Sequence, residues 1–191
     1  MVPDTATEAQ LSQVRICGYG GQGIVLAGML LGKAASLYDG KEAVFTQSYG
    51  PEARGGASTA DVVISSESVD YPLVVQPDVL VILFQEAYVR YRPTLPPGGI
   101  LIVESDLVHI KEEDEGCAKL PATRMAEELG ARIVTNVVVL GFLVGMTNVV
   151  SREACEKAIA STVKPKTIDL NFSAFSAGFE KGAQERLSHE R

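Results

Sequence analysis

A glycine-rich turn near the start of the chain is the strongest candidate for binding chemistry. Gly18, Gly20 and Gly23 have G-x-G-x-x-G spacing, with Gly21 and Gln22 between them. Residues 14–17 have the pattern of a short strand, and apolar residues after the turn keep helical spacing. Such glycines allow a tight turn and let backbone N–H groups approach a phosphate at the positive end of the helix. The sequence therefore predicts an anion-binding turn formed by these five residues.

The turn alone does not indicate a dinucleotide site. An NAD-binding domain also places Asp or Glu at the end of the second strand, about 20 residues further on, to bind the ribose hydroxyls. Here that strand ends at 45–48 without an acidic residue, and the nearest arginine, Arg54, does not follow it directly. NAD(P) binding is therefore disfavoured, while a turn that serves only helix–sheet packing stays open. Gln22 has no packing reason to be polar at a helix start, which favours a bound ligand or a contacting subunit.

A second glycine-rich stretch, 48–56, follows the second expected strand. Its candidate site residues are Ser48, Tyr49, Gly50, Glu52 and Arg54. Long loops between sheet strands are often functional. Arg54 could hold a phosphate or a carboxylate through two hydrogen bonds, and the alternative is an ion pair with Glu52 or Asp61.

The chain offers no catalytic constellation. It has two histidines, His109 and His189, and neither belongs to a Ser/His/Asp or Cys/His set; His109 is expected to be a lone surface histidine. The acidic run 112–115 is expected to be a solvated face. Its three cysteines are far apart in sequence with no C-x-x-C, which excludes an iron–sulfur cluster or a four-cysteine zinc site held by this chain alone. We therefore predict no catalytic residue and no metal ligand here.

Composition limits the class of protein. The 191 residues carry a formal net charge of −7, with no cluster of Lys and Arg that would bind nucleic acid. The longest apolar run, 137–146, is about half of the ~20 residues that a membrane span requires. Residues 1–13 lack the apolar core of a signal peptide. We expect a soluble cytoplasmic protein without nucleic-acid or membrane partners, whose redox chemistry depends on a bound cofactor or a partner.

The elements that must position the two glycine-rich segments alternate along the chain. Strands are expected at 14–17, 43–47, 60–65, 79–84, 100–103 and 132–135, and helices at 22–38, 86–91, 121–130, 136–148 and 151–163. The strand at 79–84 is apolar at every position, as in the middle of a parallel sheet covered on both faces. The fold class is therefore α/β: a single doubly wound, mostly parallel sheet with helices on both faces, Rossmann-like. Both glycine-rich segments fall at the carboxyl ends of strands, where ligands bind in such sheets.

The helix expected at 136–148, with Asn136 as its N-cap, has an unusual surface. Its residues 137–146 are apolar on all faces, so the whole helix must be covered. We infer that another subunit covers it, and that Gly141 and Gly145, which are four residues apart, let this partner approach closely. The alternative is a helix in the centre of the core.

Three segments are expected along the chain. Residues 1–13 form a flexible N-terminal arm, residues 14–179 the α/β domain, and residues 180–191 a C-terminal tail, with extended chain from 164 onward.

The two glycine-rich segments together resemble the gamma subunit of 2-oxoacid:ferredoxin oxidoreductases. The matching residues are 18–24, 46–56, 70–72, 76–78, Asn136 before the apolar helix, and 171–178. The sequence of residues 47–54 is more similar to enzymes of the 2-oxoglutarate type than to those of the pyruvate type. One departure is Thr59, where close relatives are expected to have arginine.

The resemblance implies a multisubunit enzyme that decarboxylates a 2-oxoacid on thiamine diphosphate. It implies that electrons leave through iron–sulfur clusters to ferredoxin and that the acyl group ends on coenzyme A. The thiamine and the clusters would lie on the alpha, beta and, where present, delta subunits. The gamma subunit would contribute to coenzyme A access or binding and to closure of the active site, and would be inactive in isolation.

Roles for particular residues follow from that resemblance. The turn at 18–23 would donate backbone N–H groups to a phosphate of coenzyme A. Tyr49, Glu52 and Arg54 would shape the crevice that faces the thiamine-binding subunits. The competing interpretations are a purely structural subunit of the same complex and a stand-alone NAD(P)-binding oxidoreductase.

Overall fold

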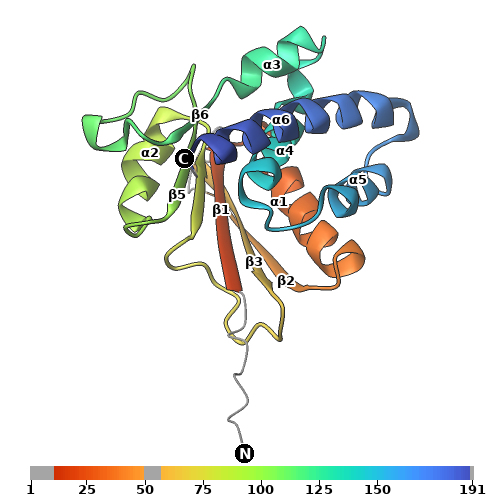
Figure 1. Cartoon of the computed structure of the whole chain (residues 1–191), viewed down its shortest axis with the longest axis horizontal. Helices are drawn as coiled ribbons and strands as arrows, with labels where there is room; N and C mark the ends of the chain where they lie inside the picture. Colours follow the sequence, from red (N-terminus) through yellow and green to blue (C-terminus); the bar gives the residue numbers. More distant parts are fainter. Residues whose placement is uncertain (1–10, 50–56, 190–191) are drawn as a thin grey trace, which may run out of the picture.

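The computed structural model describes residues 11–49 and 57–189, which form one six-stranded sheet with helices on both faces (Figure 1). The strands are β1 (Leu11–Tyr19), β2 (Glu42–Tyr49), β3 (Ala57–Ser65), β4 (Val79–Ile82), β5 (Ile100–Glu104) and β6 (Ala118–Leu120). Their order is β2-β3-β1-β4-β5-β6, and β3 alone runs antiparallel to its neighbours. This confirms the predicted mostly parallel α/β sheet.

The helices cover the two faces unequally. They are α1 (Ile24–Lys33), α2 (Gln85–Tyr91), α3 (Ala122–Glu128), α4 (Thr135–Thr147), α5 (Arg152–Ala160) and α6 (Ile168–His189). Alternate residues of β4 point to opposite faces: Val79 and Val81 join a core with α1, α3, α4, α5 and α6, and Leu80 and Ile82 join a smaller core with α2. The apolar pattern of β4 therefore reflects burial on both faces.

One expected element is wrong in type, and one strand was not predicted. Residues 132–135 were expected to form a buried strand, but Arg132–Val134 is a 3₁₀ turn that leads into α4. The last strand of the sheet is instead β6, which pairs with β5. Residues 118–120 and 132–134 each carry one charged residue between or beside apolar ones, so the local pattern does not distinguish a strand from a turn. Residues 118–120 form a strand because they pair with β5.

The apolar helix α4 is covered by this chain itself. In Figure 1 the helix α6 lies along α4, and together they cover the sheet above α1. Gly141 and Gly145 face the α6 backbone, and Gly178 and Gly182 face the α4 backbone in return. The inference that another subunit covers this helix is therefore wrong, and the alternative of a central core helix is confirmed. The predicted close approach at Gly141 and Gly145 occurs, within one chain.

The observed boundaries of the folded part differ from the predicted ones at both ends of the chain. Residues 11–13 belong to β1, so the strand begins earlier than the expected boundary at 14. The tail expected from 164 onward is mostly the helix α6, which continues to His189 across the expected boundary at 179 and 180. Packing against α4 supplies the stability that the mixed pattern of this segment does not indicate.

Candidate functional site

The glycine-rich turn connects the end of β1 to the start of α1, as predicted. The Gln22 backbone N–H donates to the Tyr19 carbonyl oxygen at 3.1 Å, and the Gln22 Oε1 accepts from the Tyr19 N–H at 2.6 Å. Its Nε2 donates to the Leu83 carbonyl oxygen at 3.4 Å. Gln22 is therefore polar because it closes the turn and joins it to the chain after β4. The prediction that Gln22 has no packing reason to be polar is wrong, so its polarity does not by itself favour a ligand or a contacting subunit.

The glycines of the turn divide into two pairs. A Cβ on Gly18 would lie 2.6 Å from Ile24 Cγ2, and one on Gly23, whose φ is +72°, would lie 2.7 Å from Asn136 Nδ2. These two glycines are required by packing. A Cβ on Gly20 or Gly21 would meet nothing within 4 Å. Packing thus explains why Gly18 and Gly23 are glycines, while the backbone at Gly20 and Gly21 faces open space.

Asn136 has a role that the sequence did not indicate. It was expected to be the N-cap of α4, but it is the second residue of that helix, and Val134 occupies the cap without a side-chain bond. The Asn136 Nδ2 donates to the Gly23 carbonyl oxygen at 3.1 Å. Because Asn136 is buried, this bond fixes the turn against α4. The sequence shows only that Asn136 is a polar residue beside an apolar run. Its contact with Gly23, which is distant in sequence, explains why a polar residue is buried there.

A cavity of about 290 Å³ opens beside the turn. It is lined by Gly21, Gln22, Thr123, Arg132, Ile133 and Thr135. The Arg132 side chain is 71% exposed and contacts Glu127 only at 3.9 Å, so its charge is available to an anion. The exposed backbone of Gly20 and Gly21, the uncapped first turn of α1 and this guanidinium together favour a negatively charged group.

The second glycine-rich segment reaches the same edge of the sheet. Tyr49 on β2 and Gly18 on β1 both stand opposite Ser58 of β3, and the Ser58 hydroxyl donates to the Gly18 carbonyl oxygen at 3.2 Å. Ser48 and Tyr49 are exposed, and neither lines the cavity beside Gly21. Gly50, Glu52 and Arg54 lie outside the described residues. Their predicted roles stay predictions.

Asp61, the other partner considered for Arg54, is held by Arg15. The Arg15 Nη2 and Nε donate to the two carboxylate oxygens of Asp61 at 2.6 and 2.9 Å. Arg15 Nη2 also donates to the Val74 carbonyl oxygen at 2.6 Å. This mostly buried pair joins the interior strands β1 and β3, and its bond to Val74 fixes the segment that leads from β3 to β4.

The acidic run 112–115 is only partly the solvated face that was expected. Asp114 is buried, where it accepts from the Tyr88 hydroxyl at 2.5 Å and pairs with Arg92 at 2.7 Å. The bond from Arg92 holds the pKa of Asp114 below its usual value. Expecting a solvated face at this position was wrong, because a partner distant in sequence neutralises the charge.

The three cysteines are free thiols. Burial raises the pKa of Cys117 to about 11, and it raises the pKa values of Cys17 and Cys155 further. All three are therefore protonated near neutral pH. Within residues 11–49 and 57–189, no group of three or more His, Cys, Asp or Glu side chains is placed to hold a metal ion. Over the same residues, the helices are all too short or too polar to cross a membrane.

Glu104 ends β5 with a carboxylate that is incompletely paired. Its Oε1 accepts from the Thr123 N–H at 3.4 Å, while its buried Oε2 has no partner among the described residues. Burial raises the pKa of Glu104, and the bond from Thr123 offsets this only in part. The ionised form is thus less favourable in the folded chain than in the unfolded one.

The contribution of Glu104 to the free energy of unfolding is therefore expected to depend on pH. Because its folded pKa is raised, its contribution is fully present below the unfolded pKa and is lost as pH rises through the folded pKa. Glu104→Gln should remove this loss, so its free energy of unfolding should exceed that of the natural chain more at pH 8 than at pH 4. Urea unfolding at both pH values measures this difference. An equal effect of the substitution at the two pH values would contradict the prediction.

Sequence comparison relates the chain to a known family. Residues 13–181 match the family described as pyruvate ferredoxin/flavodoxin oxidoreductase. The chain is 52% identical over 172 residues to the 2-oxoglutarate synthase subunit KorC of Methanocaldococcus jannaschii, covering 88% of this chain and 92% of that protein.

Solved structures agree with this. The gamma subunit of a keto/oxoacid ferredoxin oxidoreductase from Geobacter sulfurreducens is 44% identical with a TM-score of 0.84, over 92% of this chain and 98% of that one. A 2-oxoglutarate:ferredoxin oxidoreductase from Magnetococcus marinus, solved with 2-oxoglutarate, coenzyme A and succinyl-CoA bound, has a TM-score of 0.82 over 92% of this chain and 31% of that one. At 22% identity it shows a shared fold.

Proposed function

Because this chain belongs to the pyruvate ferredoxin/flavodoxin oxidoreductase family, as the gamma subunit of a 2-oxoacid:ferredoxin oxidoreductase of the 2-oxoglutarate type, we propose that its glycine-rich turn binds a phosphate of coenzyme A. The observation that carries this proposal is the open space over Gly20 and Gly21 beside the cavity that contains Arg132. Packing requires glycine at neither Gly20 nor Gly21, although the φ of +102° at Gly21 also favours glycine there. The exposed guanidinium supplies a cation that would pair with a phosphate.

Within the proposal, each part of the site has a different task. The backbone N–H groups of Gly20 and Gly21 donate to the phosphate oxygens, and Arg132 contributes charge. Gln22 and Asn136 hold the turn in shape from its two sides through Tyr19, Leu83 and Gly23. Coenzyme A supplies the thiol that accepts the acyl group, and this chain's residues bind and orient its anionic end.

The remaining chemistry belongs to other subunits in this proposal. The 2-oxoacid is 2-oxoglutarate, and thiamine diphosphate and the iron–sulfur clusters lie on alpha, beta or delta subunits. The wide separation of the cysteines and the protonated state of their thiols support this division, because a cluster requires several thiolates together. Ile133, whose side chain is 86% exposed beside the cavity, is the apolar residue that a neighbouring subunit would cover.

Gly20→Leu tests the turn directly. Because a Cβ at Gly20 meets nothing within 4 Å and its φ is not positive, the substitution should leave the fold intact and fill the space above the turn. In the complex assembled with its partner subunits, the KM for coenzyme A is expected to rise at least about tenfold, with a smaller change in kcat. Steady-state kinetics with varied coenzyme A and saturating 2-oxoglutarate measure both constants.

Gly116→Leu is the matched control. Gly116 is equally open and lacks a positive φ, but it lies at the other end of the strands. It should leave the KM for coenzyme A unchanged. If Gly20→Leu also leaves this KM unchanged while the complex assembles normally, the turn does not bind coenzyme A and the alternative of a purely structural subunit is favoured.

A further inference from the structure

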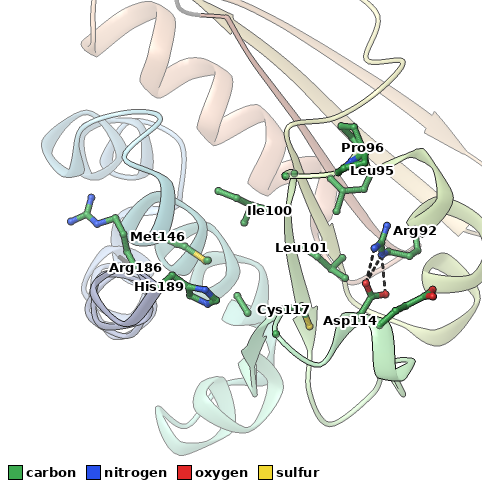
Figure 2. Close-up of a pocket in the computed structure, with 16 residues that line it drawn as sticks. Arg92, Leu95, Pro96, Ile100, Leu101, Asp114, Cys117, Met146, Arg186 and His189 are labelled. Atoms are coloured by element: carbon green, nitrogen blue, oxygen red, sulfur yellow. Dashed lines mark hydrogen bonds and ion pairs between the residues drawn. The ribbon is translucent and has the colours of Figure 1, made fainter. Parts of the chain in front are cut away.

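A second cavity in the described part of the chain shares no residue with the glycine-rich turn. Its volume is about 640 Å³, within the roughly 300–1,000 Å³ typical of small-molecule sites. It opens at the amino ends of β5 and β6, beside Ile100 and Ala118, whereas the turn follows the carboxyl end of β1. In Figure 2 the side chains of Met146 and His189 extend from the helices toward these strands, and the Arg186 guanidinium points away.

One wall of the cavity carries a backbone donor without an acceptor. The Ile100 N–H donates to Asp78 on the β4 side, so the N–H of Leu101 must point toward β6. But β6 pairs with β5 only from Ile102 onward, and no hydrogen bond from the Leu101 N–H is formed to any described residue. Leu101 is 5% exposed. Buried backbone N–H groups are almost always paired, so this one requires an acceptor in the cavity.

The other polar groups around the cavity also favour an acceptor. Asp114 is already paired with Arg92 and Tyr88, and the exposed Glu113 lies 3.6 Å from Lys111. His189 contacts Glu185 of its own helix at 3.5 Å, and its imidazole extends toward the strands in Figure 2. The Leu101 N–H and the His189 imidazole are therefore two donors that face the cavity, and the buried Asp114 carboxylate is already paired.

The rest of the lining is apolar. Leu95, Ile100, Leu101, Cys117, Ala118 and Met146 surround the space, and Gly98, Gly99 and Gly116 leave its rim without side chains. An occupant should therefore combine an apolar body with an acceptor group that can serve both donors. Water alone can pair with the donor but makes no favourable contact with the apolar walls.

We propose that this cavity is a binding site for a small apolar carboxylate, such as an aromatic or branched aliphatic acid. The carboxylate accepts from the Leu101 N–H and the His189 imidazole, and the apolar body packs against Leu95, Ile100 and Met146. No covalent step is involved. The proposal does not depend on coenzyme A binding at the glycine-rich turn, because the two cavities have no residue in common.

Phenylacetate is the probe, with 2-phenylethanol as the uncharged comparison of nearly the same shape. Titration into the ¹⁵N-labelled full chain should move the Leu101 amide resonance in a saturable way, and 2-phenylethanol should bind at least about tenfold more weakly. Isothermal calorimetry gives both affinities. Equal binding of the two probes, or saturable binding of phenylacetate that leaves the Leu101 resonance in place, would overturn the proposal.

Two pairs of variants locate the site. Gly116→Phe places a ring in the cavity without backbone strain, because a Cβ there meets nothing within 4 Å, and Gly116→Ala leaves most of the volume free. The first should abolish phenylacetate binding and the second should preserve it. His189→Gln should weaken binding several-fold, while His109→Gln, which changes a histidine outside this cavity, should not. Unaltered binding in Gly116→Phe means that phenylacetate binds outside this cavity and refutes the proposal.

Discussion

Gly141→Ala is expected to lower the free energy of unfolding by more than about 3 kcal/mol, near the upper end of what overpacking costs in a core. A Cβ at this position would collide with the Phe175 carbonyl oxygen, and it would lie 2.9 Å from the Phe179 backbone nitrogen. Both neighbours are backbone atoms of α6, which cannot change rotamer. The two helices would have to move apart along their whole contact. Urea unfolding followed by circular dichroism measures the loss.

Gly32→Ala is the matched control for this substitution. Gly32 also lies in a helix, α1, but its Cβ would lie at ordinary contact distances of 3.6 and 3.7 Å from Phe45 and Val62 side chains. The higher helix propensity of alanine should then raise stability by up to about 1 kcal/mol. The two glycine-to-alanine changes are thus expected to have opposite signs. A Gly141→Ala chain as stable as the Gly32→Ala chain would show that α4 and α6 do not meet at their glycines.

Arg15→Met is expected to cost about 3–5 kcal/mol of unfolding free energy, the range found when one partner of a buried ion pair is removed. The Arg15 and Asp61 side chains are each 12% exposed, so the remaining carboxylate would be left in the sheet with little water. The hydrogen bond to the Val74 carbonyl would also be lost, which should loosen the segment before β4. Chemical unfolding at pH 7 gives the magnitude, and hydrogen exchange over residues 66–78 reports on the segment.

The double variant Arg15→Met/Asp61→Val separates the pair from its surroundings. Since a buried ion pair can be replaced by apolar residues of similar size with little loss, the double variant should recover most of the stability that Arg15→Met loses. If the double variant is as unstable as the single one, the loss comes from the packing of Arg15 and its contact with Val74, and the charge left on Asp61 is not its cause.

Local pattern was sufficient for the elements that create the candidate site. The turn at 18–23 lies between a strand and a helix, and β4 is buried on both faces, as the sequence predicts. These features depend on neighbouring residues: glycine permits the turn, and an unbroken apolar run must be buried wherever it lies. The turn is also among the residues that carry the resemblance to the gamma subunits, which the comparisons confirm.

Other features were decided by residues distant in sequence. The apolar sequence of α4 predicts that another element packs over it, but does not show which one. The element is α6, because glycines on both helices let the two backbones approach closely: Gly141 and Gly145 on α4, and Gly178 and Gly182 on α6. The helical character of 168–189 was missed because its apolar pattern is interrupted by polar residues and glycines. Its stability comes from α4.

Within the site, the sequence by itself determined which backbone can approach a ligand, because glycine is the only residue without a Cβ. It did not determine which glycines are left open. The tertiary structure made Gly18 and Gly23 packing positions and left Gly20 and Gly21 exposed, since Ile24 and Asn136 occupy the space beside the first pair. It likewise buried Asp114 and placed Arg132 beside the turn, because the energy of a charge depends on the side chains that the fold brings near it.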